Sequence, residues 1–122
     1  MSKLAQTNST ATTQMTKNDF YRDKRVRETE WWLHSCDLPT LQWARLRVFN
    51  DGTADSCFGP HEILFGFDNR DYAGYFLSED EYIRLNAMDH EDETEYDVVL
   101  ATIAAPEWPE LDDQDFKYLG TY

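Results

Sequence analysis

The sequence predicts one α+β domain, in which a small antiparallel sheet of about five strands is joined by one or two short helices and acidic loops. Between residues 30 and 67, short runs of aromatic and aliphatic residues alternate with turn residues, as in an antiparallel sheet. Beyond residue 67, the apolar spacing becomes helical. Seven Phe, seven Tyr and four Trp among 122 residues can fill one core, despite a net charge of −13.

The first 18 residues are rich in Ser, Thr, Asn and Gln and have almost nothing to bury, so we expect a flexible N-terminal tail at 1–18 and a folded acidic domain at 19–122. Asn18 is a suitable N-cap. It favours a short basic helix within residues 19–29.

Strands are expected at residues 30–36, 41–49, 53–58 and 61–67. The residues Asn50, Asp51 and Gly52 separate the second from the third and are the strongest hairpin signal in the sequence. A turn is expected at 37–40, where Pro39 follows Asp37 and Leu38.

The second half of the chain is expected to be partly helical. Asp68 can cap a short helix that runs through Leu77, although Gly74 weakens it and a strand at 72–77 is the alternative. Ser78 and Glu81 match a capping box and predict a helix at 79–88. The β-branched run predicts a strand at 96–104, and the aromatic residues of the C-terminal segment indicate that it packs onto the domain.

Acidic residues are concentrated in the C-terminal part. Residues 1–47 hold eight basic and five acidic side chains, whereas residues 48–122 hold three basic and nineteen acidic ones. Such a field repels nucleic acid and anionic lipid and attracts cations or basic proteins. Without a signal peptide or a long apolar run, we expect a cytoplasmic protein with no membrane partner, whose cysteines are reduced.

Six carboxylates within residues 89–97 repel one another unless a cation or basic partner is present. Ca²⁺ takes six to eight oxygen ligands without strict geometry, so clustered carboxylates are candidate ligands. The glycine spacing excludes an EF-hand, and solvated surface charge is the alternative interpretation. The candidate calcium ligands are Asp37, Glu79, Asp80, Asp89, Glu91, Asp92, Glu93, Glu95, Asp97, Asp112 and Asp113.

Other chemistry has less support in the sequence. His34, Cys36, Cys57 and His61 could converge on Zn²⁺, but their spacing matches no common zinc module. The hydrolase, zinc-protease and nucleotide-binding motifs are absent, so we expect no enzymatic activity. Trp108, between two prolines, is either an interface anchor or, as we expect, packed against the core.

Residues 76–82, the acidic run at 89–97, residues 105–108 and the ending at 116–122 resemble the CcbP-like family of small acidic calcium-binding proteins from heterocyst-forming cyanobacteria. The resemblance covers roughly residues 30–122 and supplies no ligand motif. It implies a cytosolic protein that sequesters Ca²⁺ without EF-hands until it is removed when vegetative cells differentiate into heterocysts.

Two functional hypotheses follow from the sequence. The first is a calcium buffer that holds Ca²⁺ through clustered surface carboxylates. The second is an acidic inhibitor or immunity-type protein that mimics nucleic acid or masks a basic protein surface. They differ in whether binding depends on calcium.

Overall fold

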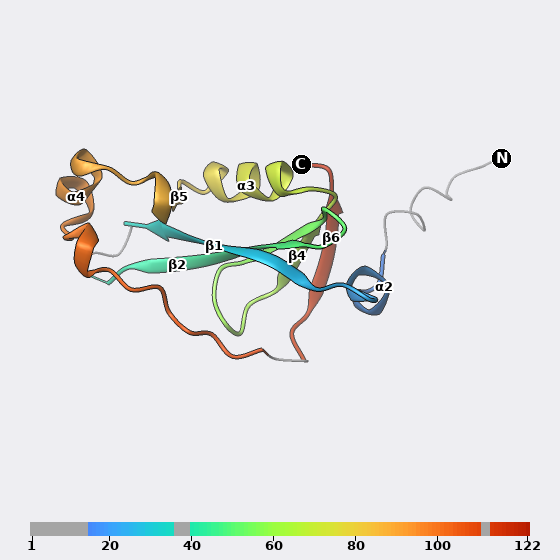
Figure 1. Ribbon diagram of the computed structural model, residues 1–122. Coiled ribbons are helices and arrows are strands. Elements are labelled where there is room, and N and C mark those ends of the chain that lie inside the picture. Colours follow the sequence, from blue (N-terminus) through green and yellow to red (C-terminus); the bar gives the residue numbers. More distant parts are fainter. Residues whose placement is uncertain (1–14, 36–39, 111–112) are drawn as a thin grey trace.

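The structure, a computed structural model, describes residues 15–35, 40–110 and 113–122 (Figure 1). Its elements follow the order α2 (Lys17–Tyr21), β1 (Val26–His34), β2 (Gln42–Phe49), β3 (Ala54–Cys57), β4 (Leu64–Phe67), α3 (Arg70–Glu79), β5 (Ile83–Arg84), η1 (Leu85–Ala87), α4 (His90–Tyr96), η2 (Leu100–Thr102) and β6 (Phe116–Gly120). The α+β class is therefore confirmed. None of the helices in these ranges combines the length and apolarity needed to cross a bilayer.

One mixed sheet of six strands runs in the order β5-β1-β2-β3-β4-β6. Every neighbouring pair is antiparallel except β4 and β6, which are parallel. The expectation of about five strands, all antiparallel, is therefore wrong at this edge. The pairing joins residues about fifty positions apart, so no local turn signal could indicate its direction.

The hairpin between β2 and β3 forms where the sequence predicts it. Gly52 adopts a φ of 90°, which favours glycine. The carboxylate of Asp51 accepts hydrogen bonds from the backbone N–H and the hydroxyl of Thr53, at 3.1 and 2.6 Å. Local turn chemistry thus fixes the register in which Val48 pairs with Ala54 and Arg47 with Asp55.

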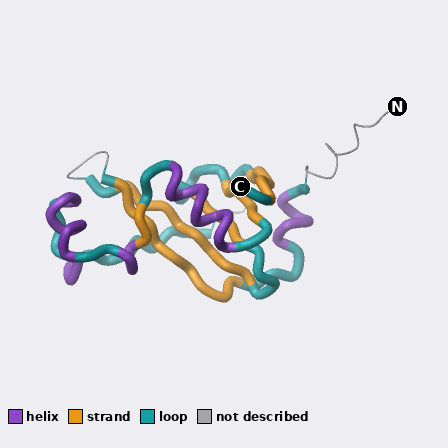
Figure 2. Tube along the Cα trace, turned by 90° about the horizontal axis from the view of Figure 1, so that it is seen from above, coloured by secondary structure: helices purple, strands orange, loops and turns teal. Residues whose placement is uncertain are grey.

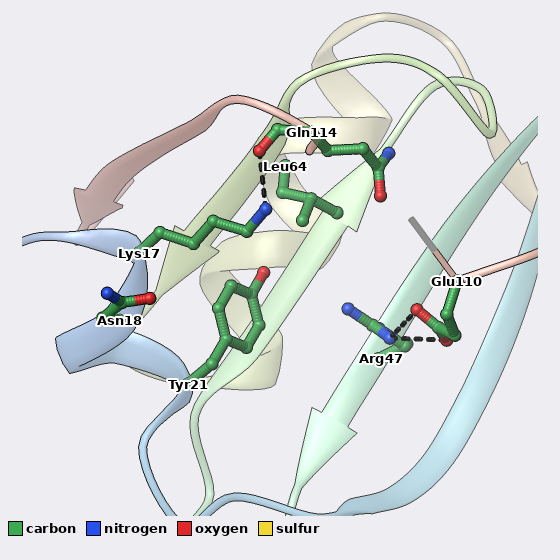
Figure 3. A pocket seen from close by; sticks show the side chains of 7 residues that line it. All are labelled: Lys17, Asn18, Tyr21, Arg47, Leu64, Glu110 and Gln114. Carbon is green, nitrogen blue, oxygen red and sulfur yellow. Dashed lines mark hydrogen bonds and ion pairs between the residues drawn. The ribbon is translucent and has the colours of Figure 1, made fainter. Parts of the chain in front are cut away.

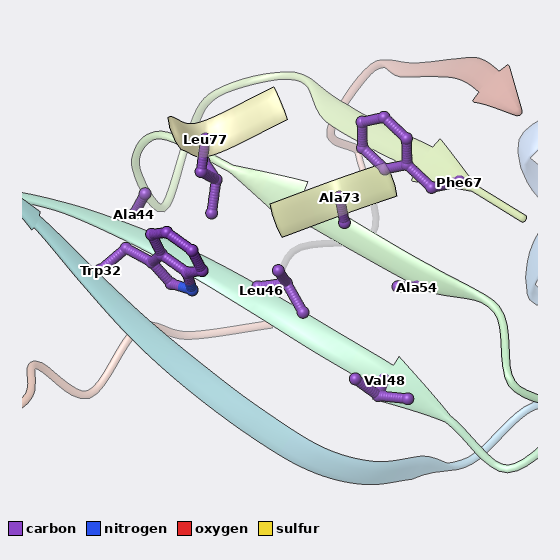
Figure 4. Close-up of a cluster of buried hydrophobic side chains, with 8 residues drawn as sticks. All are labelled: Trp32, Ala44, Leu46, Val48, Ala54, Phe67, Ala73 and Leu77. Carbon is purple, nitrogen blue, oxygen red and sulfur yellow. The ribbon is translucent and has the colours of Figure 1, made fainter. Parts of the chain in front are cut away.

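The main core lies between the sheet and α3, which crosses one face (Figures 2 and 4). Leu77 from α3 packs onto a layer that includes Trp32, Leu46 and Phe67. Asn69 caps the helix by accepting a hydrogen bond from the N–H of Tyr72 at 3.0 Å. The short helix expected after Asp68 is therefore confirmed, with the cap one residue later, and the alternative strand at 72–77 is wrong.

The helix expected at 79–88 does not form, because α3 ends at Glu79. The N–H of Tyr82 donates to the carbonyl of Leu77 at 3.1 Å, and Glu81 adopts a φ of 66°, so the chain turns there. It then enters β5, where Ile83 pairs with Leu33 of β1. The pairing of β5 with β1 is therefore more favourable than the helix that the capping pattern of Ser78 and Glu81 predicts.

The strand expected at 96–104 is also absent. Tyr96 is the last residue of α4, and Asp97 ends that helix in the left-handed conformation, at φ 55°. The short helix η2 follows at Leu100–Thr102. The apolar side chains of this stretch pack without strand pairing around Leu33. The β-branched residues of this stretch therefore contribute to burial and do not form a strand, because no neighbouring strand is hydrogen-bonded to them.

The sheet face opposite α3 is covered at both ends. At one end α2 places Phe20 against Phe116 of β6, with ring centroids 5.0 Å apart. The basic helix expected within 19–29 is limited to Lys17–Tyr21, is capped by Thr16 and gives way to β1 at Val26. At the other end lies α4, so the two helices occupy opposite ends of the sheet (Figure 1).

Residues 103–110 cross this same face below β2 (Figure 1). Trp108 packs edge-on against Trp31, with ring centroids 5.0 Å apart, and the guanidinium of Arg45 lies 5.9 Å from its ring. Trp108 is half-buried by these contacts. Trp108 therefore packs onto the sheet face, outside the two buried apolar clusters.

Candidate functional site

The acidic run at 89–97 is built largely as α4, and part of its charge has a local structural role. Asp89 is the N-cap, and its carboxylate accepts hydrogen bonds from the N–H groups of Glu91 and Asp92 at 3.0 and 3.2 Å. Asp92 completes the capping box by accepting from the N–H of Asp89 at 2.8 Å. These two carboxylates therefore neutralise the partial positive charge of the helix N-terminus.

Glu93 connects α4 to the segment that follows. Its carboxylate accepts a hydrogen bond from the N–H of Leu100 at 2.8 Å and lies 3.1 Å from the imidazole Nδ1 of His90. The bond from Leu100, followed by the contact with His90, lowers the pKa of Glu93. This carboxylate thus fixes the connection between α4 and η2.

The phenol of Tyr96 is influenced by charges from both acidic segments. Burial raises the pKa of its phenol, and the negative charges of Glu95, Asp92 and Glu81 raise it further. Glu81 comes from the turn after α3, whereas Asp92 and Glu95 belong to α4. Because the chain turns after α3 instead of continuing as a helix to residue 88, the charge of Glu81 acts on the same phenol as the charges of α4.

The other candidate ligands lie elsewhere. Desolvation raises the pKa of the Tyr122 phenol, and the negative charges of Glu79 and Asp80 raise it further. Asp113 precedes Gln114, which contacts Lys17 of α2, so it lies at the opposite end of the sheet from α4. Asp37 and Asp112 fall outside the described residues.

Glu91, Glu95 and Asp97 are exposed, and their carboxylates make no hydrogen bond or ion pair to another described residue. Across the described ranges, no three His, Cys, Asp or Glu side chains form a group that could hold a metal ion. The acidic side chains near α4 therefore form an open surface.

The zinc hypothesis has little structural basis among the residues described. Cys57 is a free, buried thiol whose pKa is raised by burial, and His61 is exposed. His34 packs edge-on against Tyr82, with ring centroids 5.0 Å apart. Cys36 lies outside the described residues.

A second site, which the sequence analysis missed, is a pocket of about 370 Å³ between α2 and the sheet (Figure 3). Arg47 forms part of its wall and reaches two carboxylates. It donates to Asp55 from Nε and Nη2 at 3.1 and 2.6 Å, and from Nη1 to both oxygens of Glu110 at 2.9 and 3.1 Å. The lining residues are Lys17, Asn18, Tyr21, Arg47, Leu64, Glu110 and Gln114.

Electrostatics hold the groups of this pocket in fixed protonation states. Burial and the neighbouring Asp55, to which its hydroxyl donates at 2.7 Å, raise the pKa of Tyr21 far above the ordinary value. Burial would lower the pKa of Arg47, but Asp55 and Glu110 outweigh it and raise the pKa. At neutral pH the pocket therefore contains a neutral phenol beside a guanidinium cation.

One sequence signal could have identified this pocket. Arg45 and Arg47 occupy alternate positions of the otherwise apolar strand at 41–49, so both point to the same sheet face. Two arginines on a buried face require carboxylate partners. The sequence could not show that these partners come from β3 and from residue 110.

No protein-family model, no curated protein and no solved structure matches this chain.

Proposed function

We propose that this protein binds calcium ions loosely and reversibly at the surface formed by Glu81, Glu91, Asp92, Glu95 and Asp97, and thereby buffers them. We call these five residues the acidic surface. The observation that carries the proposal is that the carboxylates of Glu91, Glu95 and Asp97, on α4 and its C-terminus, are exposed and make no ion pair with another described residue. The negative charges of Glu81, Asp92 and Glu95 also raise the pKa of the Tyr96 phenol, so both acidic segments contribute to the field there.

The open arrangement of the acidic surface determines what kind of binding it supports. A hydrated Ca²⁺ ion attracted by several separate carboxylates keeps much of its water, so each contact is weak and screened by salt. We expect a dissociation constant on the order of 0.1–1 mM, in the range of the weaker oxygen-ligand sites. This affinity suits a buffer that releases its ions readily.

A titration of the chelator-treated protein with CaCl₂ at constant ionic strength tests the proposal. We expect saturable NMR shifts in the α4 amides and a fall in the phenol pKa of Tyr96, because a bound cation offsets the carboxylates that raise it. At ten times the dissociation constant, mass action should stabilise the fold by about 1.4 kcal/mol.

The variant Glu81→Gln/Glu95→Gln should lose the saturable response. The matched control is Glu107→Gln/Asp113→Asn, which removes the same charge at exposed positions outside the acidic surface. Equal loss in both variants, or an equal response to Mg²⁺ and Na⁺, would show that the effect is general screening and would contradict the proposal.

The resemblance to the CcbP-like family extends this proposal to the regulation of heterocyst differentiation in the cytoplasm. If the chain buffers calcium there, its expression in a heterocyst-forming cyanobacterium should lower free calcium and reduce heterocyst frequency. The Glu81→Gln/Glu95→Gln variant should do neither. If the unaltered protein and the variant changed free calcium and heterocyst frequency equally, this role would be contradicted.

A second function, masking a basic protein surface, is supported by a different feature of the same side chains. Glu91, Glu95 and Asp97 are exposed and spread over α4 and its C-terminus, which suits a broad cationic surface. Such binding would weaken with NaCl and would not depend on calcium. A basic protein captured equally well with chelator and with CaCl₂ would favour this function over buffering.

A further inference from the structure

We infer that the pocket between α2 and the sheet binds a small oxyanion, a carboxylate or a phosphate group, which takes the place of Glu110 against Arg47. This site is independent of calcium binding and lies at the opposite end of the sheet from α4 (Figures 1 and 3). Its volume, about 370 Å³, falls in the range of small-molecule sites.

The first support is the position of positive charge. Arg47, 8% exposed, lies against the pocket, and the ammonium of Lys17 reaches the carbonyl of Gln114 at 2.7 Å on another part of the wall. The Nη1 of Arg45, a residue outside the lining, is 3.6 Å from the carboxylate of Glu110. Two cations, Lys17 and Arg47, thus line this pocket in a protein whose net charge is −13.

The second support is that Arg45 is incompletely satisfied. Its side chain is 6% exposed, and its Nε has no hydrogen-bond partner among the residues that the structure describes. Its contact with Glu110, at 3.6 Å, is longer than a normal hydrogen bond. A buried guanidinium in this state favours an anion that can approach more closely than the tethered carboxylate does.

The third support is the contrast between the two carboxylates on Arg47. Asp55 is 1% exposed and is held by Tyr21 as well, so it is a fixed part of the fold. Glu110 is 67% exposed at its side chain, yet it makes the two-oxygen contact that an oxyanion ligand would make. Because the carboxylate of Glu110 is open to solvent, an external anion can replace it, and the buried guanidinium of Arg47 remains paired when it does.

Glu110 therefore acts as an internal competitor. A tethered group has a high effective concentration, and it reduces the apparent affinity of the free ligand accordingly. Arg47 keeps its bond to Asp55 when Glu110 leaves, so the guanidinium stays in position for a two-point contact with a carboxylate or phosphate.

The test uses the full chain and two probes, sodium succinate and inorganic phosphate, each compared with NaCl at the same ionic strength. Binding is followed by NMR of the side-chain N–H groups of Arg47 and by calorimetry. We expect Glu110→Gln to bind at least one probe ten times more tightly than the unaltered chain does. The probe that binds identifies the ligand as a carboxylate or a phosphate compound.

Glu107→Gln is the matched control, because it removes one exposed carboxylate from the same segment without touching Arg47; its affinity should stay unchanged. Lys17→Met should weaken binding severalfold, since it removes the second cation of the pocket. Three results would overturn the inference. Glu110→Gln and the unaltered chain could bind the probes with equal affinity, the NMR shifts could occur at residues other than Arg47, or neither probe could bind.

Discussion

Arg47 and Asp55 form a two-point ion pair across β2 and β3, with N–O distances of 3.1 and 2.6 Å, on the sheet face opposite the main core. The hydroxyl of Tyr21 also donates to Asp55, at 2.7 Å, so the pair connects α2 to the sheet. Both charges are at least nine-tenths buried. This pair is therefore both a structural element and a wall of the pocket.

Replacement of Asp55 by Asn should destabilise the protein by about 3 kcal/mol, because it leaves a buried guanidinium without its fixed counter-charge. Urea unfolding measures the loss. Asp19→Asn is the control, since the ion pair of Asp19 with Arg22 is exposed on both sides and should contribute less than about 0.5 kcal/mol. Similar effects of the two substitutions would mean that the buried pair adds little stability.

Glu30 and Arg70 should show a similar dependence on the opposite face. Glu30, 4% exposed, accepts two hydrogen bonds from Arg70 at 2.9 Å each, which join β1 to α3. Arg70→Met should cost about 2 kcal/mol, because it removes the main counter-charge of a buried carboxylate. Thermal unfolding of Asp71→Asn provides the comparison, since Arg70 also contacts this exposed residue at 3.5 Å. A larger loss in Asp71→Asn would contradict this account.

Gly66 is required for close packing between the sheet and α2. A Cβ at this position would lie 2.6 Å from Phe116 and 2.9 Å from Phe20, both ring carbons. Gly66→Ala should therefore destabilise the fold by about 1–3 kcal/mol, because neither packed ring can move freely. At Gly59 the nearest atom, 3.0 Å away, belongs to the flexible side chain of Glu62, so Gly59→Ala should cost much less. Denaturant unfolding measures both variants, and a midpoint for Gly66→Ala no lower than that for Gly59→Ala would contradict this account.

The contacts of Glu93 should make the stability depend on pH in the acid range. Its pKa is lowered in the folded state, so the folded protein binds this proton less readily than the unfolded chain does. The stabilisation is present above the ordinary value of 4.5 and is lost as the pH falls through the lower folded pKa. Glu93→Gln should reduce the fall of the unfolding free energy as the pH drops below 4.5, the ordinary pKa of this carboxyl. If the unfolding free energy of the variant depended on pH as steeply as that of the unaltered protein, Glu93 would not have this role.

Local signals were sufficient where one short stretch carries all the information. Asn50, Asp51 and Gly52 specify a tight turn, and the alternation on either side of it specifies two paired strands, so the hairpin of β2 and β3 could be predicted. Local signals did not suffice to predict where the helices begin and end. Ser78 and Glu81 match a capping box as well as the true caps do, and only the burial of Leu77 and the pairing of β5 with β1 determine where the helix ends.

The same division applies to the sites. The clustering of carboxylates at 89–97 could be read directly from the sequence. The sequence did not indicate that the charge of Glu81 raises the pKa of Tyr96, or that Asp113 lies at the other end of the sheet. The pocket joins residues from positions 17 to 114, most of which are unremarkable in the sequence. Only Arg45 and Arg47, on one face of a largely apolar strand, could have indicated it.

The sequence by itself determined the α+β class, the central hairpin, the core aromatics and the strongly acidic character, because these depend on composition and on neighbours within a few residues. The tertiary structure alone decided the parallel pairing of β6, the ends of α3 and α4, and the ion pairs of Arg47. The physical reason is that each of these requires partners far apart in the chain, whose contact becomes favourable only when the whole core has formed.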